Sequence, residues 1–466
     1  MTIQEMARIR PHERQLAWQE LEFTAFFHYG INTFTNREWG TGKEEPSLYN
    51  PASLDTDQWC AAIKAAGIRA CILTAKHHDG FCLWDTACTK HSVMSSSKPQ
   101  DVIALLAASC EKYGLKLGLY LSPWDMHESS YGSGEKYNDF FCSQLEELLT
   151  RYGSLYSLWF DGACGEGPNG KKQIYDWDRY YALIRRRQPQ AVISIMGPDV
   201  RWIGNEAGET RPSEWSVVPS RLFNTDKIAE NSQQADNAQF RQQPIQSWDK
   251  DLGSRKFLEH EAALIWYPAE TDVSIRPGWF YHPEEDGKAK SVETLLHIYE
   301  TSVGGNSVLL LNIPPGTGGR IHEKDCQRLA ELGSAINGIF DMNLLANAQA
   351  RADSEYPSHP AANILQQGGD YWRPAGERAE IEIWLPRRQR VSHIALQEQI
   401  RESQRIEAFS LYAKAVGGWQ KIYSGTTVGY KKIARFPPVE TDALRISIEQ
   451  SRIYPTLCFA GAYLES

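Results

Sequence analysis

The strongest constraint on the fold is a regular alternation of short apolar runs with helical patterns through the first 340 residues. The apolar runs occupy residues 23–30, 68–80, 115–125, 155–162, 191–198 and 308–315, with a weaker one at 262–270. Uninterrupted apolar strands are typical of a parallel sheet that is covered on both faces. So many strand–helix repeats predict an α/β barrel of the TIM type. Because residues 200–290 follow no clear pattern, we expect an irregular (β/α)8-like barrel.

A different pattern begins after residue 345. Short runs of alternating apolar and polar residues, such as EIEIWLP and HIALQEQI, are separated by turn residues, and no long helical pattern interrupts them. This pattern predicts an antiparallel β-sandwich. Since 466 residues are too many for one average domain, we expect two domains, a barrel at 1–343 and a sandwich at 344–466.

Charge and composition exclude several classes of partner. The net charge is -9 and no run of Lys or Arg stands out, so we expect no nucleic-acid partner. Every apolar run is shorter than the roughly 20 residues that span a bilayer, so we expect no membrane insertion. The first 23 residues lack the apolar core of a signal peptide, which predicts a cytoplasmic protein, or a secreted or periplasmic one if a leader was removed.

Polar and aromatic side chains follow the ends of the predicted barrel strands. Those at the first four strand ends include His28, the pair His77 and His78, Trp124 and Asp161. In a barrel of this kind the reacting groups come from the C-terminal ends of the strands. A carboxylate at a strand mouth also avoids the cost of burial in mid-strand. The sequence therefore predicts a polar cleft with an aromatic rim at this end of the barrel.

Three chemistries could use such a cleft. His28, His77, His78 and Asp161 are possible metal ligands, but adjacent residues on a strand point to opposite faces, and neither HxH nor HExxH occurs. A nucleophilic serine is disfavoured because no G-x-S-x-G motif is present. Glycoside hydrolysis needs two carboxylates and aromatic surfaces on which sugars stack, and both are available. We expect no metal and no cofactor.

The second carboxylate is expected in the irregular segment RWIGNEAGETRPSEWSVV, residues 201–218. Glu206 is flanked by asparagine and glycine, in a stretch too polar and glycine-rich for a helix interior. It lies between two tryptophan-bearing stretches, which favours a site role. Glu209 and Glu214 compete with it on these grounds, and the pattern alone does not choose among the three.

Several motifs together resemble one known family. FFHYGINTF, TAKHHDGFCLWDT, YLSPWD, LWFDGA, GNEAG and GGNSVLLLNIPPGTGG occur in this order over residues 7–340. This set is similar to that of the family 29 glycoside hydrolases, the retaining α-L-fucosidases. EYPSHPAANILQ and the following YWRP resemble the opening of the galactose-binding, discoidin-like modules that often follow the barrel in this family. For this sandwich a structural role is favoured over sugar binding.

The resemblance implies a two-step displacement with two carboxyl groups roughly 5–5.5 Å apart. Asp161 would be the nucleophile and Glu206 the acid/base. The residues implied to bind the sugar are His28, Trp39, His77, His78, Tyr120, Trp124 and Trp279. The partner would be a fucosylated oligosaccharide or glycan.

The position of the acid in GNEAG resembles the branch of the family that acts on α-1,3- and α-1,4-linked fucose in Lewis-type and milk oligosaccharides. The resemblance therefore implies an exo-α-L-fucosidase with this linkage preference. An alternative is a broad-specificity α-L-fucosidase that also accepts α-1,2 or α-1,6 links. A third interpretation, a non-catalytic sugar-binding protein, is disfavoured because both carboxylates lie in intact motifs.

Overall fold

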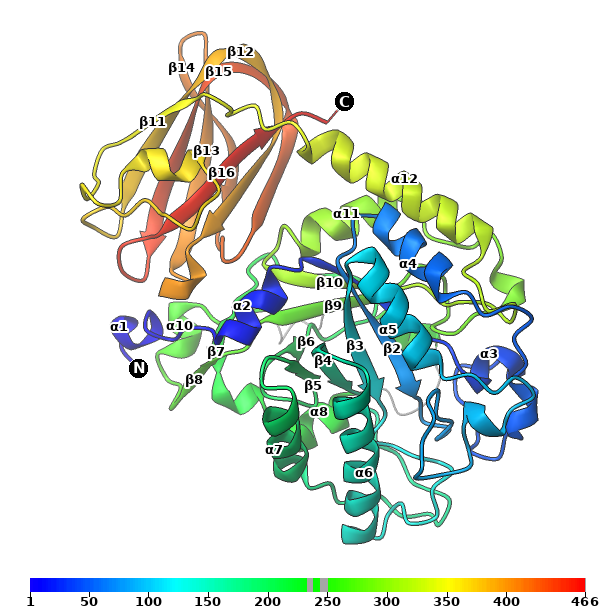
Figure 1. Ribbon diagram of the computed structural model, residues 1–466. Coiled ribbons are helices and arrows are strands. Elements are labelled where there is room, and N and C mark those ends of the chain that lie inside the picture. The colour runs from blue at the N-terminus through cyan, green and yellow to red at the C-terminus, as the bar shows by residue number, and fades with distance from the viewer. Residues whose placement is uncertain (233–237, 244–249, 466) are drawn as a thin grey trace.

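Eight parallel strands form the barrel sheet in the computed structural model, which describes residues 1–232, 238–243 and 250–465 (Figure 1). Their order is β5-β4-β3-β2-β1-β10-β9-β6, and a parallel bridge between Ser194 and Val200 draws the two edges together. The sheet is therefore a nearly closed barrel, as predicted. The strands are β1 (Phe23–Phe27), β2 (Ala70–Lys76), β3 (Lys116–Leu121), β4 (Leu155–Phe160), β5 (Val192–Ile195), β6 (Arg201–Trp202), β9 (Ala269–Ser274) and β10 (Ser307–Asn312).

The weaker strand prediction at 262–270 is wrong in part. Leu264–Trp266 forms β8, which pairs with β7 (Val217–Pro219) in a separate two-stranded sheet. The barrel strand β9 begins later, at Ala269. It carries Glu, Asp and Ser at every second position and so contains no apolar run. A strand with polar side chains toward the barrel interior escapes a search for continuous apolar runs.

Helices with ordinary cap chemistry connect most of the barrel strands. In α5 (Val102–Tyr113) the Asp101 side chain accepts the N–H of Ala104 at 2.8 Å, and Gly114 ends the helix at a φ of 65°. The other long helices are α4 (Thr56–Ala65), α6 (Glu135–Arg151), α7 (Trp177–Arg187), α11 (Val292–Ser302) and α12 (Glu323–Phe340). The short ones are α1 (Ile3–Met6), α2 (Glu13–Gln19), α3 (Ile31–Thr35), α8 (Thr225–Asn231), α9 (Ala238–Arg241) and α10 (Arg255–Leu258). Within the described part of the chain, every helix is too short or too polar to span a bilayer.

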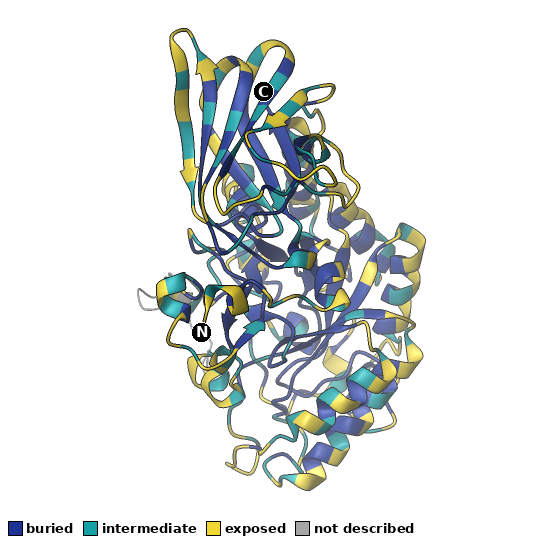
Figure 2. Cartoon of the chain, turned by 90° about the vertical axis from the view of Figure 1, so that its left-hand side faces the viewer, coloured by how far each residue is buried: buried dark blue, intermediate teal, exposed yellow. Residues whose placement is uncertain are grey.

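The C-terminal strands form an antiparallel sheet around a second apolar core. They are β11 (Gln349–Ala352), β12 (Ala379–Glu398), β13 (Ile406–Ala415), β14 (Gly418–Gly425), β15 (Lys432–Ser451) and β16 (Leu457–Tyr463). The stretches EIEIWLP and HIALQEQI, expected as separate strands, lie largely within the single strand β12. Register shifts after Trp384 and Val391 let β12 turn while it stays paired with β15. Figure 2 shows the resulting buried interior and the exposed outer faces.

The sandwich lies against the N-terminal end of the barrel. Glu22, directly before β1, accepts from Lys431 Nζ at 2.6 Å, and Asn306, directly before β10, accepts from Tyr430 N at 2.7 Å. Gly305 also forms an antiparallel bridge with Lys432. In Figure 1 strands β2 and β3 point away from the sandwich. The C-terminal strand ends, where the site is expected, are thus at the opposite end of the barrel.

Candidate active site

A single pocket at the C-terminal ends of the barrel strands collects most of the predicted residues. His28, His77 and Asp161 each come directly after a strand, β1, β2 and β4. Trp39, His78, Glu206 and Trp279 enter from the following loops. The remaining lining residues are Phe26, Glu38, Trp159, Gly162, Ala163, Ile195, Trp202, Ser232, Phe240 and Asp272.

Two hydrogen bonds orient the carboxyl group of Asp161. Its Oδ1 accepts the N–H of Ala163 at 2.8 Å, and its Oδ2 accepts the hydroxyl of Tyr120 at 3.0 Å. Burial raises the pKa of Asp161, and both hydrogen bonds oppose that rise because they stabilise the ionised form. His78 Nε2 lies 3.8 Å from the same Oδ2. The group is therefore a fixed carboxylate facing the pocket, with a quarter of its side chain exposed.

Glu206 sits in a different environment. Trp279 Nε1 donates to its Oε2 at 3.0 Å. Burial, together with the charge of Asp161, raises the pKa of Glu206 to about 7, although the bond from Trp279 opposes the shift. Glu206 thus holds its proton to a much higher pH than an exposed glutamate does. A carboxylic acid that is protonated near neutral pH can donate a proton to a leaving group.

The three histidines present neutral rings to the pocket. Burial lowers the pKa of His28 and His78 to about 3, and lowers that of His77 well below its usual value. His28 Nδ1 lies 2.8 Å from Asn312 Oδ1. Since the Asn312 amide nitrogen donates to Trp279 O, its oxygen faces His28, so Nδ1 carries the proton and Nε2 is left as an acceptor. Neutral imidazoles can exchange hydrogen bonds with sugar hydroxyls.

Tyr120 and Trp124 lie behind the pocket wall instead of lining it. Tyr120 reaches the site through its bond to Asp161, and its ring stacks on His77 with centroids 5.6 Å apart. Trp124 contacts the rings of His78 and Trp39 and donates to Glu166 O at 2.9 Å. Both therefore support residues that face the substrate space.

The sequence analysis does not identify the other ten lining residues as site residues, and Glu38, Trp159, Trp202 and Asp272 are among them. Glu38 accepts the backbone N–H of Trp279 at 3.0 Å and pairs with His282 Nε2 at 2.7 Å. Asp272 accepts from Trp202 Nε1 at 2.7 Å. The sequence contained a signal for two of these residues. Glu38 directly precedes the predicted site residue Trp39, and Asp272 belongs to a strand, β9, in which Glu270 and Asp272 lie two positions apart.

The structure separates the three glutamates of the irregular segment. Glu206 lines the pocket, whereas Glu209 is exposed. Glu214 is buried beside Arg201 and Arg211; burial acts against ionisation, but the two guanidinium groups hold its pKa below the usual range. Among the described residues, His, Cys, Asp and Glu side chains form no group of three that could hold a metal ion.

Nearly the whole barrel matches the model of one protein family. The family model described as Alpha-L-fucosidase matches residues 4–338. The chain belongs to the alpha-L-fucosidase family. The family expected from the motifs is therefore confirmed, and with it a glycoside hydrolase that acts on fucosylated glycans.

Similar proteins agree with this assignment. Alpha-L-fucosidase 1 of Arabidopsis thaliana is 41% identical over 470 residues, which covers 98% of this chain and 87% of the plant protein. A Ruminococcus gnavus fucosidase, solved in complex with fucose, superposes with a TM-score of 0.85 at 28% identity and covers 98% of this chain and 95% of that one. The crystal structure of SpGH29 superposes with a TM-score of 0.85 at 31% identity, covering 98% and 99%. The fucosidase fold thus extends through the C-terminal sheet.

Proposed function

We propose that this fucosidase is a retaining exo-enzyme in which Asp161 is the nucleophile and Glu206 the acid/base. One observation carries the proposal: two carboxyl groups line one pocket, with Asp161 held by donors that favour its ionised form and Glu206 protonated up to about pH 7. Retaining glycosidases need this division between a carboxylate and a carboxylic acid.

The reaction follows in two steps. Asp161 attacks the anomeric carbon and forms a covalent ester, while the bond to the leaving oxygen breaks and Glu206 gives that oxygen its proton. Glu206, now ionised, then takes a proton from a water molecule, which attacks the same carbon and frees Asp161. Two inversions leave the released fucose with its original configuration.

Recognition of the sugar is assigned to the residues around the two carboxyls. The neutral rings of His28, His77 and His78 exchange hydrogen bonds with the hydroxyls. Trp39 and Trp279 offer apolar surface for the ring face and the methyl group of fucose.

For the linkage we propose α-1,3- and α-1,4-linked fucose, as in Lewis-type and milk oligosaccharides. The support is the position of the acid in GNEAG, within the irregular segment that follows β6. Trp202 of β6 and Phe240 of α9 also line the pocket, and their rings stack with centroids 6.2 Å apart. They offer a surface on which the sugars beyond fucose can bind and contribute remote binding energy.

The test compares Lewis a trisaccharide with 2'-fucosyllactose for wild type, Asp161→Ala and Glu206→Ala. We expect cleavage of the Lewis sugar alone, and losses of about three orders of magnitude or more in both variants. Glu209→Ala is the matched control, because this glutamate of the same segment is exposed, and it should keep full activity. NMR of the first product should show the α-anomer.

Each part of the proposal can fail separately. Equal cleavage of fucosyllactose would remove the linkage preference and leave the enzyme class intact. A first product with inverted configuration would exclude the retaining mechanism. An active Glu206→Ala variant would show that the acid is another residue.

A further inference from the structure

The segment that carries Glu206 connects the pocket to the sandwich. It leaves the barrel after β6 at Ile203 and reaches the N-terminal end of the barrel by Ser216. From Ile203 to Ser216 it contains neither a helix nor a strand. A segment without its own backbone ladder depends on side-chain hydrogen bonds for its position.

The pocket end of this segment is a tight loop tied by Asn205. Asn205 Oδ1 accepts the N–H groups of Ala207 and Glu209 at 3.0 and 3.1 Å, and its Nδ2 donates to Glu209 O at 3.0 Å. Ala207 also forms a bridge with Val273 of β9. Glu206 lies inside this loop, so its carboxyl moves with the loop.

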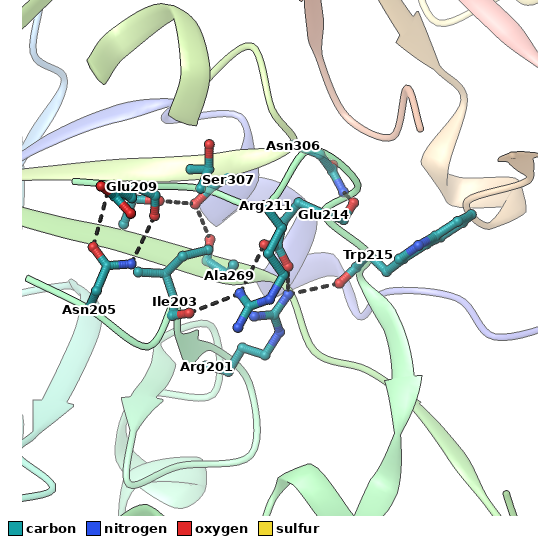
Figure 3. A network of polar contacts seen from close by, with 12 residues as sticks. Arg201, Ile203, Asn205, Glu209, Arg211, Glu214, Trp215, Ala269, Asn306 and Ser307 are labelled. Atoms are coloured by element: carbon teal, nitrogen blue, oxygen red, sulfur yellow. Dashed lines mark hydrogen bonds and ion pairs between the residues drawn. The ribbon is translucent and has the colours of Figure 1, made fainter. Parts of the chain in front are cut away.

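A buried charge cluster holds the middle of the segment (Figure 3). The Glu214 carboxylate lies between the guanidinium groups of Arg201 and Arg211 and is 1% exposed. Arg211 Nη1 donates to Ile203 O at 2.9 Å, and Arg201 Nη2 donates to Trp215 O at 3.0 Å. The cluster therefore ties the far end of the segment to the residues just before Glu206.

The sandwich holds the far end. Gln404, fully buried, accepts the N–H of Ser216 at 2.7 Å through Oε1 and donates to Glu214 O at 3.1 Å through Nε2. Arg452 lies over the ring of Trp215 at 4.3 Å from its centroid. These contacts place Glu214, whose carboxylate is bound to both arginines.

Some contacts between the barrel and the sandwich do not involve the segment that carries Glu206. Lys431 Nζ pairs with Glu22 at 2.6 Å, at the entrance to β1, and neither residue touches the segment 203–216 in the hydrogen bonds and ion pairs of the described chain. The interface thus contains contacts that reach the Glu206 segment, such as those of Gln404, and the Lys431–Glu22 pair, which serves as a matched comparison.

We propose that Gln404 of the sandwich is a positioning residue for the acid/base Glu206, acting through the backbone of Glu214 and Ser216 and the Arg201–Glu214–Arg211 cluster. This inference rests on the proposed role of Glu206. The sandwich then contributes to catalysis from the opposite end of the barrel, without touching the sugar. A displacement of about 1 Å in a catalytic group can cost about 100-fold in rate.

The test uses leaving groups that differ in their need for an acid. The disaccharide released from Lewis a trisaccharide departs as an alcohol and needs a proton, whereas the 2,4-dinitrophenolate released from 2,4-dinitrophenyl α-L-fucoside needs none. The value of kcat/KM reports the first irreversible step, in which the acid acts. Gln404→Met keeps the side-chain volume and removes both hydrogen bonds, and Gln404→Ala is made as a second variant.

We expect Gln404→Met to lower kcat/KM for the trisaccharide by about 10-fold or more and that for the dinitrophenyl fucoside by less than about 2-fold. Lys431→Met, the interface control, should leave the ratio of the two values unchanged. Melting temperatures of all variants report folding. A general loss of structure would lower kcat/KM for both substrates by the same factor.

Two results would overturn the inference. If Glu206→Ala shows the leaving-group dependence and folded Gln404 variants do not, the positioning role is wrong while the proposed function stands. If Glu206→Ala itself lacks the dependence, Glu206 is not the acid and both proposals are wrong.

Discussion

At the scale of single residues, the two carboxyl groups of the pocket differ through their hydrogen-bond partners. Asp161 receives a backbone N–H and a tyrosine hydroxyl, both of which favour the carboxylate. Glu206 receives the indole N–H of Trp279, and burial still raises its pKa to about 7. In its proposed role as the acid Glu206 must start protonated, so activity should fall as the pH rises through this value.

Trp279→Phe should move the basic limb of the pH profile of kcat/KM upward. The indole N–H stabilises ionised Glu206, so its removal raises the pKa of this group further. The variant therefore keeps the acid protonated to a higher pH, although weaker sugar stacking raises KM. Trp39→Phe is the control, since Trp39 lines the same pocket and, among the described residues, makes no hydrogen bond to Glu206. A basic limb that shifts downward would contradict this assignment.

At the scale of elements, β9 is the unusual strand of the barrel. Glu270 and Asp272 point into the barrel. The indole N–H of Trp159 donates to Glu270 and that of Trp202 donates to Asp272, each at 2.7 Å. Burial raises the pKa of Glu270 to about 7 and that of Asp272 well above its usual value. Two acids in a strand interior are tolerated because each has a donor and can keep its proton.

Asp272→Asn should flatten the dependence of stability on pH. Because folding raises the pKa of Asp272, the folded protein keeps a proton that the unfolded chain releases above pH 4, so this group destabilises the fold increasingly as the pH rises. Asparagine keeps the oxygen that accepts from Trp202 and does not titrate. We expect the variant to melt higher than wild type at pH 8 and similarly at pH 4. Glu209→Gln, at an exposed site, should show no such difference, and equal melting at both pH values would refute the assignment.

At the scale of the whole molecule, the sandwich and barrel share apolar core. Ile433, Phe459 and Tyr463 of the sandwich belong to the same buried cluster as the barrel residues, and the ring of Tyr463 lies 5.2 Å from that of Phe340 at the end of α12. His393 and Arg435 also bind Glu300 of α11, at 3.0 and 3.1 Å. Removal of the sandwich would expose this surface.

The protein should therefore unfold in one cooperative transition. We expect a calorimetric enthalpy equal to the van't Hoff enthalpy within about 10%. A fragment of residues 1–343 should aggregate, because it would expose the apolar side of Tyr299, Phe340 and their neighbours. Two separate transitions in calorimetry, or a soluble and folded fragment, would show that the domains are independent.

The sequence by itself determined the barrel fold and the place of the polar cleft, at the C-terminal ends of the barrel strands. Continuous apolar runs that alternate with helices favour a parallel barrel sheet. The C-terminal ends of its strands lie at one end of the barrel, so Asp161 and the three histidines are expected near one another. The residues after β1, β2 and β4 could be predicted for this reason. The family motifs then added their expected roles.

Only the tertiary structure decided which glutamate faces Asp161. The segment from Ile203 to Ser216 has no periodic pattern, so local sequence does not set its path. Its position depends on contacts with residues far along the chain, such as Trp279, Gln404 and the cluster around Glu214. The same reason hid Asp272 and the true start of β9, since side chains that are polar and buried satisfy each other only across the folded barrel.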